Sequence, residues 1–191
     1  MSPGEQGRPW RLFIAVDVPK TTRAGLRSTL DPLRNVVAGA RWTEPRNWHL
    51  TLRFLGSVRP ALRQWIGEAV SEAAAGVTPF TTRLTELGAF PSAARARVLW
   101  AGLEDPGGAL TRLAAAVEGA LAPEFEPEGR PFSPHLTVAR FKEQRALPEG
   151  VAGLEVASEP FEVREVVLYR SHLGRPAARY EPLERVPLGG A

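Results

Sequence analysis

The sequence predicts an α+β fold of two pseudo-symmetric lobes that arise from an internal duplication. Two of its three histidines, His49 and His135, occur in the same His-Leu-Thr context and are 86 residues apart. The same offset of 86 aligns the apolar run that begins at Arg11 with the one that begins at Arg97. Each half therefore has the order strand, helix and His-containing strand, which is the pattern that a duplicated unit leaves.

The length of 191 residues and an apolar content of 43% suit one domain with a sizeable core. We expect a single bilobal domain over residues 1–191, with a first repeat at about 11–90 and a second at about 97–188. Similar lobes packed about a pseudo-twofold axis would place their equivalent strands side by side. The two histidines would then face each other across a groove.

In the first repeat, Arg11 to Val18 is an apolar run closed by Pro19, which predicts a buried strand. Thr21 or Thr22 is suited to cap the helix that follows. Its apolar stripe has helical spacing and consists of Leu26, Leu30, Leu33 and Val37. Pro32 should end or restart this helix, because proline lacks the amide hydrogen that a helix interior needs.

The first His-containing strand is expected from Trp48 to Leu55, ended by Gly56. Residues 60–75 have one apolar face and predict a helix that Gly76 terminates. The alternation from Phe80 to Leu87 predicts another strand, and the next residues, 88–96, are expected to form a loop at the midpoint of the chain.

The second repeat opens with a buried strand from Arg97 to Leu103, and Asp105 to Gly108 form a turn into a helix. The apolar positions of that helix are Leu110, Leu113, Ala114, Val117 and Leu121. A Pro/Glu/Gly connection from Pro123 to Pro131 leads to the second His-containing strand.

The last part of the chain has weaker patterns. Residues 142–159 are irregular in their hydrophobic pattern, which predicts no regular element there. Residues 161–169 are rich in β-forming side chains, and residues 180–188 predict a short final strand before a Gly-Gly-Ala end.

Composition limits the kinds of chemistry available. Cysteine is absent, which excludes disulfides, thiolate catalysis and cysteine-bound metals. The formal charge is +3, and lysine occurs only at Lys20 and Lys142, so the cations are mostly arginines suited to phosphate. We expect an anionic partner, with nucleic acid foremost. Met1 to Pro9 lacks a secretory pattern and no apolar run is long enough to span a membrane, so we expect a cytoplasmic protein. We also expect the protein to be a monomer.

The repeated triplet supplies a pair of acid/base groups. Side chains alternate between the faces of a strand, so His49 and Thr51 share one face, as do His135 and Thr137. An imidazole titrates near neutral pH, so one histidine can accept a proton while the other donates one. Threonine hydroxyls can hydrogen-bond to phosphate oxygens. This set predicts metal-free in-line displacement at phosphorus, without a cofactor.

Two arginines are candidates for further phosphate contacts. Alternation places Arg53 on the face of His49, and it places Arg140 off the face of His135 unless the strand bends. His172 belongs to no repeated motif and is interpreted as a surface or rim histidine.

The two His-x-Thr-x motifs, His49 to Leu52 and His135 to Val138, resemble those of the 2H phosphoesterase superfamily. Arg11 to Val16 at the start and Pro131 to Pro134 before the second motif strengthen the likeness. Within the superfamily, the chain is similar to the RNA 2′,3′-cyclic phosphodiesterases, also described as 2′-5′ RNA ligases. The similarity runs from about residue 11 to residue 188.

The resemblance implies antiparallel sheets that line a central groove, with helices outside. It also implies that the enzyme opens the 2′,3′-cyclic phosphate at RNA 3′ ends, or on small nucleotides, to a 2′-phosphate without a metal. It assigns His49 as the proton donor, His135 as the proton acceptor, and Thr51, Thr137 and Arg140 as phosphate-binding. Arg53 gains no support from it. Reversal of the chemistry would give 2′-5′ joining.

Three other interpretations remain open. The chain could be a catalytically idle module that binds RNA or nucleotides, although both motifs are intact. It could act on a different small cyclic phosphate. A metal-dependent phosphodiesterase is a further alternative, but neither motif carries the neighbouring acidic residue or extra histidine that such a site uses.

Overall fold

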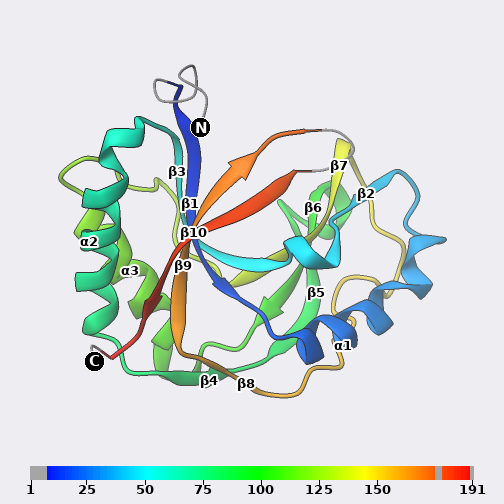
Figure 1. Cartoon of the computed structure of the whole chain (residues 1–191). Helices are drawn as coiled ribbons and strands as arrows, with labels where there is room; N and C mark the ends of the chain where they lie inside the picture. Colours follow the sequence, from blue (N-terminus) through cyan, green and yellow to red (C-terminus); the bar gives the residue numbers. More distant parts are fainter. Residues whose placement is uncertain (1–7, 175–177, 190–191) are drawn as a thin grey trace.

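A computed structural model describes residues 8–174 and 178–189 of the chain (Figure 1). Its main sheet is antiparallel and has the strand order β10-β9-β1-β3-β7-β6-β5, with β2 also paired to β7. A smaller sheet pairs β4 with β8. Residues 1–7 lie outside the described residues. They include most of the segment that was expected to lack a secretory signal.

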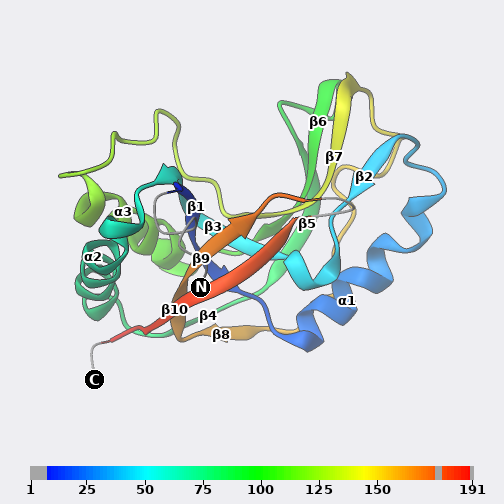
Figure 2. The same ribbon diagram turned by 45° about the horizontal axis from the view of Figure 1, so that its top comes forward.

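The strands form two lobes. The first lobe contains β1 (Trp10–Asp17), β3 (His49–Val58), β9 (Glu165–His172) and β10 (Arg179–Pro187). The second lobe contains β2 (Ala40–Trp42), β5 (Leu84–Phe90), β6 (Ala96–Leu103) and β7 (His135–Arg145). The short strands β4 (Phe80–Thr82) and β8 (Phe161–Val163) pair beside them. Figure 2 shows that β6 and β7 run at a steep angle to β9 and β10. The main sheet therefore has two differently oriented parts, one in each lobe, which we call its wings.

A single register pair, Leu50 with Leu136, joins β3 to β7 and so connects the two wings. These leucines are separated in the sequence by the same offset of 86 that aligns the two halves. The structure therefore confirms the predicted duplication and its pseudo-twofold arrangement, with the equivalent strands β3 and β7 side by side at the centre.

The lobes do not coincide with the two repeats, because each lobe takes elements from both halves of the chain. Strands β9 and β10 come from the second half but complete the sheet beside β1. Strand β2 comes from the first half but pairs with β7. The duplication thus produced interlocked lobes.

Helices α2 (Arg63–Ala75) and α3 (Ala109–Leu121) lie side by side over the first lobe in Figures 1 and 2. Both bury one face, as the apolar spacing predicts. Helix α1 (Lys20–Leu30) lies on the side of the second lobe, where Gly25 comes close to the Ala157 carbonyl oxygen. A Cβ atom at position 25 would lie 2.2 Å from that oxygen, so only glycine fits there. No helix within residues 8–174 and 178–189 is both long and apolar enough to cross a membrane.

Some predicted element boundaries are wrong. Neither Thr21 nor Thr22 caps α1, which begins at Lys20 with Pro19 in the cap position. Gly56 does not end the first His-containing strand, because it adopts a φ of 68° and β3 continues to Val58. Glycine permits this left-handed conformation without steric cost.

The other boundary differences lie near the middle and in the second half. The strand predicted from Phe80 to Leu87 is two strands, β4 and β5, and β5 extends into the predicted loop as far as Phe90. Strand β7 extends to Arg145, into a segment expected to be irregular.

Both His-containing strands carry a β-bulge at equivalent positions. Between β1 and β3, Thr51 pairs with Ala15 and Arg53 with Ile14, so Leu52 is an extra residue. Between β6 and β7, Thr137 pairs with Trp100 and Ala139 with Leu99, which makes Val138 the extra residue. A bulge shifts the alternation of the side chains that follow it by one position. This shift decides which side chains reach the groove beyond the two threonines.

Candidate active site

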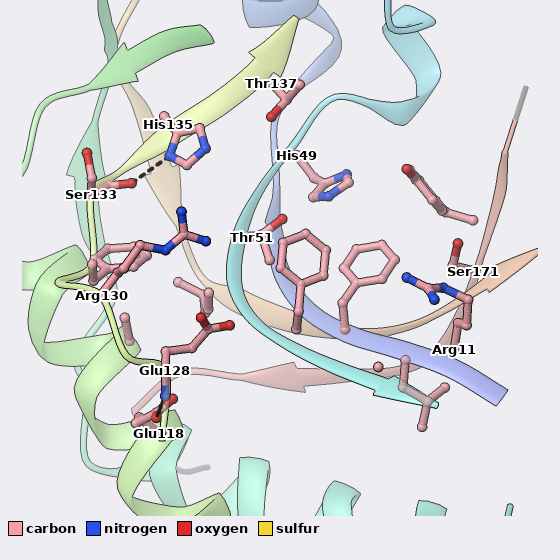
Figure 3. Close-up of a pocket in the computed structure, with 18 of the residues that line it drawn as sticks. Arg11, His49, Thr51, Glu118, Glu128, Arg130, Ser133, His135, Thr137 and Ser171 are labelled. Atoms are coloured by element: carbon pink, nitrogen blue, oxygen red, sulfur yellow. Dashed lines mark hydrogen bonds between the residues drawn. The ribbon is translucent and has the colours of Figure 1, made fainter. Parts of the chain in front are cut away.

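The two His-Leu-Thr segments line one pocket of about 770 Å³ between the lobes. His49, Thr51, His135 and Thr137 all contribute to its wall. Figure 3 shows the two imidazoles and the two threonine hydroxyl groups around the same space. The leucines that follow each histidine, Leu50 and Leu136, are fully buried, as the alternation of a strand requires.

Each imidazole is held by the same local hydrogen bond. Nδ1 of His49 donates to the backbone carbonyl of Asn47 over 2.8 Å, and Nδ1 of His135 donates to that of Ser133 over 2.7 Å. A carbonyl oxygen can only accept, so Nδ1 carries the hydrogen in both rings. In the neutral form of each ring, Nε2 is therefore unprotonated and is the nitrogen available for proton exchange with a ligand.

Aromatic rings pack against both histidines. Phe13 stacks on His49 with the ring centres 4.8 Å apart, and Tyr180 meets His49 edge-on at 5.2 Å. Phe90 meets His135 edge-on at 5.0 Å. These contacts restrict the orientation of each imidazole and partly shield it from water.

Burial lowers the pKa of both histidines because it disfavours the charged imidazolium. The pKa of His49 falls from 6.5 to about 4, and the positive charges of Arg23 and Arg140 add to the effect of burial. The Asn47 carbonyl and the Asp17 carboxylate oppose this shift. The pKa of His135 is lowered by burial and by Arg140, and is raised by the Ser133 carbonyl. Both imidazoles are therefore neutral at pH 7.

Arg140 lines the pocket together with the two histidines. Strict alternation places it on the other face of β7, but the bulge at Val138 moves it to the face of His135 and Thr137. The expectation from alternation is wrong at this position, and the bend implied by the family resemblance is present. Arg140 supplies a positive charge that affects both imidazoles.

The equivalent bulge in β3 has the opposite effect on Arg53. Alternation places Arg53 on the face of His49, but the extra residue Leu52 turns it away. The Arg53 side chain is 7% exposed and forms ion pairs with Glu118 and Glu128. It is not among the described residues that line the pocket, and its charge is balanced by carboxylates. The structure therefore places Arg53 off the face of His49 on which alternation put it.

Residue Phe54 takes the place in the groove that Arg53 was expected to occupy. It is 54% exposed and lines the pocket. Phe54 was not predicted as a site residue, and neither were Arg130 and Tyr180, which also line the pocket. Phe54 enters the groove only because of the bulge at Leu52, and Tyr180 enters it only because β10 pairs with β9. Neither feature has a local sequence signal.

The third histidine, His172, is not among the described pocket-lining residues. Its Nε2 lies 2.5 Å from the Glu181 carboxylate on the neighbouring strand β10. No group of three or more His, Cys, Asp or Glu side chains that could hold a metal ion is found in the described part of the chain.

Comparison with known proteins finds a family model that matches the chain in two consecutive segments. The family model described as "LigT like Phosphoesterase" matches residues 16–100 and 102–180. The RNA 2′,3′-cyclic phosphodiesterase of Archaeoglobus fulgidus is 38% identical over 178 residues, which are 91% of this chain and 97% of that protein. The protein of the same name from Geobacillus stearothermophilus is 33% identical over 94% of this chain, but the chain spans only 57% of that relative.

Solved structures with the same fold cover nearly the whole chain. The protein TT0787 of Thermus thermophilus has a TM-score of 0.81 and 30% identity, and the match covers 94% of this chain and 98% of that one. Escherichia coli LigT complexed with 3′-AMP has a TM-score of 0.75 and 29% identity, with coverage of 94% and 98%. The doubled motif, the interlocked lobes and the matching of both repeats together show that this chain belongs to the LigT-like family of 2H phosphoesterases.

Proposed function

We propose that this protein hydrolyses the 2′,3′-cyclic phosphate at the 3′ end of RNA, or on a small nucleotide, to a 2′-phosphate by metal-independent acid/base catalysis. The observation that carries the proposal is the matched pair of imidazoles. Both have Nδ1 bonded to a backbone carbonyl, which leaves Nε2 of His49 and of His135 for proton transfer in the shared pocket. Relatives that are 25–38% identical are named RNA 2′,3′-cyclic phosphodiesterases, which supports the choice of substrate.

In the proposed reaction, Nε2 of His135 removes a proton from a water molecule, whose oxygen attacks phosphorus. The bond between phosphorus and O3′ breaks, and His49 gives a proton to O3′. The products are a 2′-phosphate and a free 3′-hydroxyl group. Thr51 and Thr137 hydrogen-bond to the non-bridging oxygens, and Arg140 balances the charge that develops on them. A 5′-hydroxyl group in place of water would join two RNA ends by a 2′-5′ bond.

The donor role requires His49 to be protonated, whereas burial lowers its pKa to about 4. A bound phosphodiester brings a negative charge beside the ring and favours the imidazolium form. Substrate binding and protonation of His49 are therefore coupled. A neutral His135 is the form required of a proton acceptor, and the lowered pKa of this residue keeps it neutral.

The test uses a short RNA that ends in a 2′,3′-cyclic phosphate, in the presence of EDTA. The wild type should produce the 2′-phosphate, and His49→Ala and His135→Ala should each lose activity almost completely, since each acid/base group contributes about 10² to 10⁴ in rate. His172→Ala removes the third histidine, which lies outside the pocket lining, and should retain the wild-type rate. Wild-type turnover by either pocket variant would overturn the acid/base assignment.

The same assay separates the other interpretations. Wild-type protein that binds the RNA without converting it would indicate an idle binding module. Activity that EDTA abolishes and a divalent metal restores would indicate a metal-dependent phosphodiesterase. Conversion of a nucleoside 2′,3′-cyclic phosphate at a far higher kcat/KM than the RNA would indicate a small cyclic phosphate as the preferred substrate.

A further inference from the structure

The segments that lead into the two histidines are held in different ways. Before His49, strand β2 pairs with β7, and the amide of Thr43 donates to the Val138 carbonyl over 2.8 Å. Before His135, residues 122–134 form no strand in the described part of the chain. At the end of the second approach, the amide of Leu103 on β6 donates to the Pro134 carbonyl over 3.3 Å. The hydrogen bonds of a sheet therefore hold the first approach well before its histidine, whereas the residues before Pro134 in the second approach are held by another device.

That device is centred on Arg53. Its Nε lies 2.9 Å from a carboxylate oxygen of Glu118 on α3, and its Nη1 lies 3.1 Å from one of Glu128. Its Nη2 donates to the backbone carbonyl of Glu126. The amide of Glu128 donates to Glu118 over 2.6 Å, which closes the network. One buried guanidinium thus connects β3, α3 and the segment that leads to the second histidine.

The segment held by Arg53 forms a wall of the pocket and ends at the carbonyl that orients the second imidazole. Pro127, Glu128, Arg130 and Ser133 all line the pocket. The Ser133 carbonyl accepts the hydrogen bond from Nδ1 of His135. Figure 3 shows Glu118, Glu128, Arg130 and Ser133 along one side of the space, with His135 at the end.

We propose that Arg53 is a positioning residue for His135: it holds residues 126–133 against α3, so that the Ser133 carbonyl stays on Nδ1 and leaves Nε2 free as the proton acceptor. Its consequence for turnover rests on the proposed function, whereas its consequence for the ring tautomer does not. An arginine suits this role because its planar fork can contact three acceptors at once. The offset of 86 places Ala139 at the position of the second repeat that corresponds to Arg53. The segment before His49 is therefore not held by an equivalent arginine.

The direct test reads the tautomer of His135 by NMR on protein with ¹⁵N-labelled histidine, at a pH where the rings are neutral. In the wild type, we expect His49 and His135 both to carry the hydrogen on Nδ1. In Arg53→Gln, we expect His135 to shift toward the Nε2-protonated form while His49 is unchanged. A general loss of stability would affect both rings or neither, so this pattern is specific to positioning.

The matched control is Arg63→Gln. Like Arg53, Arg63 contacts both a backbone carbonyl and a carboxylate, which belong to Leu183 and Glu184. It is not among the described pocket-lining residues. It should leave both tautomers as in the wild type. Glu128→Ala removes one partner of Arg53 at a half-exposed position and should shift the His135 tautomer in the same direction, by less. This variant decides the question if Arg53→Gln does not fold.

Kinetics with the cyclic-phosphate RNA provide the second readout. Arg53→Gln should lower kcat about 10- to 100-fold, the size expected of a misplaced catalytic group, with a smaller change in KM. Wild-type tautomers together with wild-type kcat in the folded variants would overturn the proposal. A wild-type protein that does not open the cyclic phosphate would overturn the proposed function alone, because the tautomers still test the role of Arg53.

Discussion

Leu50 of β3 lies opposite Leu136 of β7, and this pair joins the two wings of the main sheet at the pseudo-twofold axis. Both side chains are fully buried, so each should contribute strongly to stability. Leu50→Ala and Leu136→Ala should each lower the free energy of unfolding by about 2–5 kcal/mol. Urea denaturation measures this change.

The control for those variants is Leu173→Ala, since Leu173 is 70% exposed. It should change the free energy of unfolding by less than about 0.5 kcal/mol. The double variant of Leu50 and Leu136 should differ from the sum of the single effects, because contacting residues are coupled. Strict additivity would show that the pair does not act as a unit.

The lowered histidine pKa values predict an acidic optimum for kcat/KM, which reports the titration of the free enzyme. One histidine must be protonated and the other neutral. The pKa values of both histidines are lowered from 6.5, that of His49 to about 4, so the maximum of the bell-shaped profile should lie below pH 6.5. Rates measured from about pH 3.5 to 8.5 test this, and a maximum above about pH 7 would contradict the shifts.

Burial of His49 also predicts how stability depends on pH. The unfolded chain takes up a proton near pH 6.5, whereas folded His49 does so only near pH 4. The unfolded state therefore binds more protons between these values, and stability falls as the pH drops through this range. The free energy of unfolding should decline less from about pH 7 to about pH 4.5 in His49→Gln than in the wild type. Equal declines would show that His49 is not buried in its neutral form.

Arg140 should contribute to phosphate binding and to the low histidine pKa values. Arg140→Met removes a positive charge that lowers the pKa of both histidines, so the limbs of the kcat/KM profile should move to higher pH. KM should also rise, because the phosphate loses a cationic partner. Lys142→Met, an exposed charge on the same strand outside the described pocket lining, should change neither property.

The threonines should act in the transition state. Thr51→Val and Thr137→Val remove a hydrogen-bond donor with little change in shape, and each should lower kcat by about 10² to 10³ if the hydroxyl groups stabilise the developing charge. KM should change less. Thr81→Val, at an exposed position of β4, is the matched control. A rise in KM at constant kcat would indicate ground-state binding only.

The general fold and the centre of the site can be predicted from the sequence because they depend on repetition and periodicity. The offset between His49 and His135 predicts a pseudo-twofold pair, and the structure places both in one pocket. The bulges could not be predicted, since Leu52 and Val138 resemble ordinary strand residues. That single extra residue in each strand explains why alternation failed for Arg53 and for Arg140.

The exchange of strands between the lobes also has no local signal. Residues 165–172 and 179–187 have strand-like composition, but the pairing of β9 with β1 and of β10 with β9 depends on contacts across the chain. Tyr180 reaches His49 through this pairing, so it could not be identified as a neighbour of the site. Local propensity determines the type of an element far better than it determines its partner.

The interlocking of the halves has a consequence for how the chain folds. Strand β1 ends at Asp17, but its neighbour β9 begins only at Glu165. The first lobe therefore cannot complete its sheet until β9 and β10 have been synthesised, and its contacts join segments that lie far apart in the sequence. Such long-range pairing slows folding. Although the sequence keeps the mark of a duplication, neither half contains all the strands of one lobe.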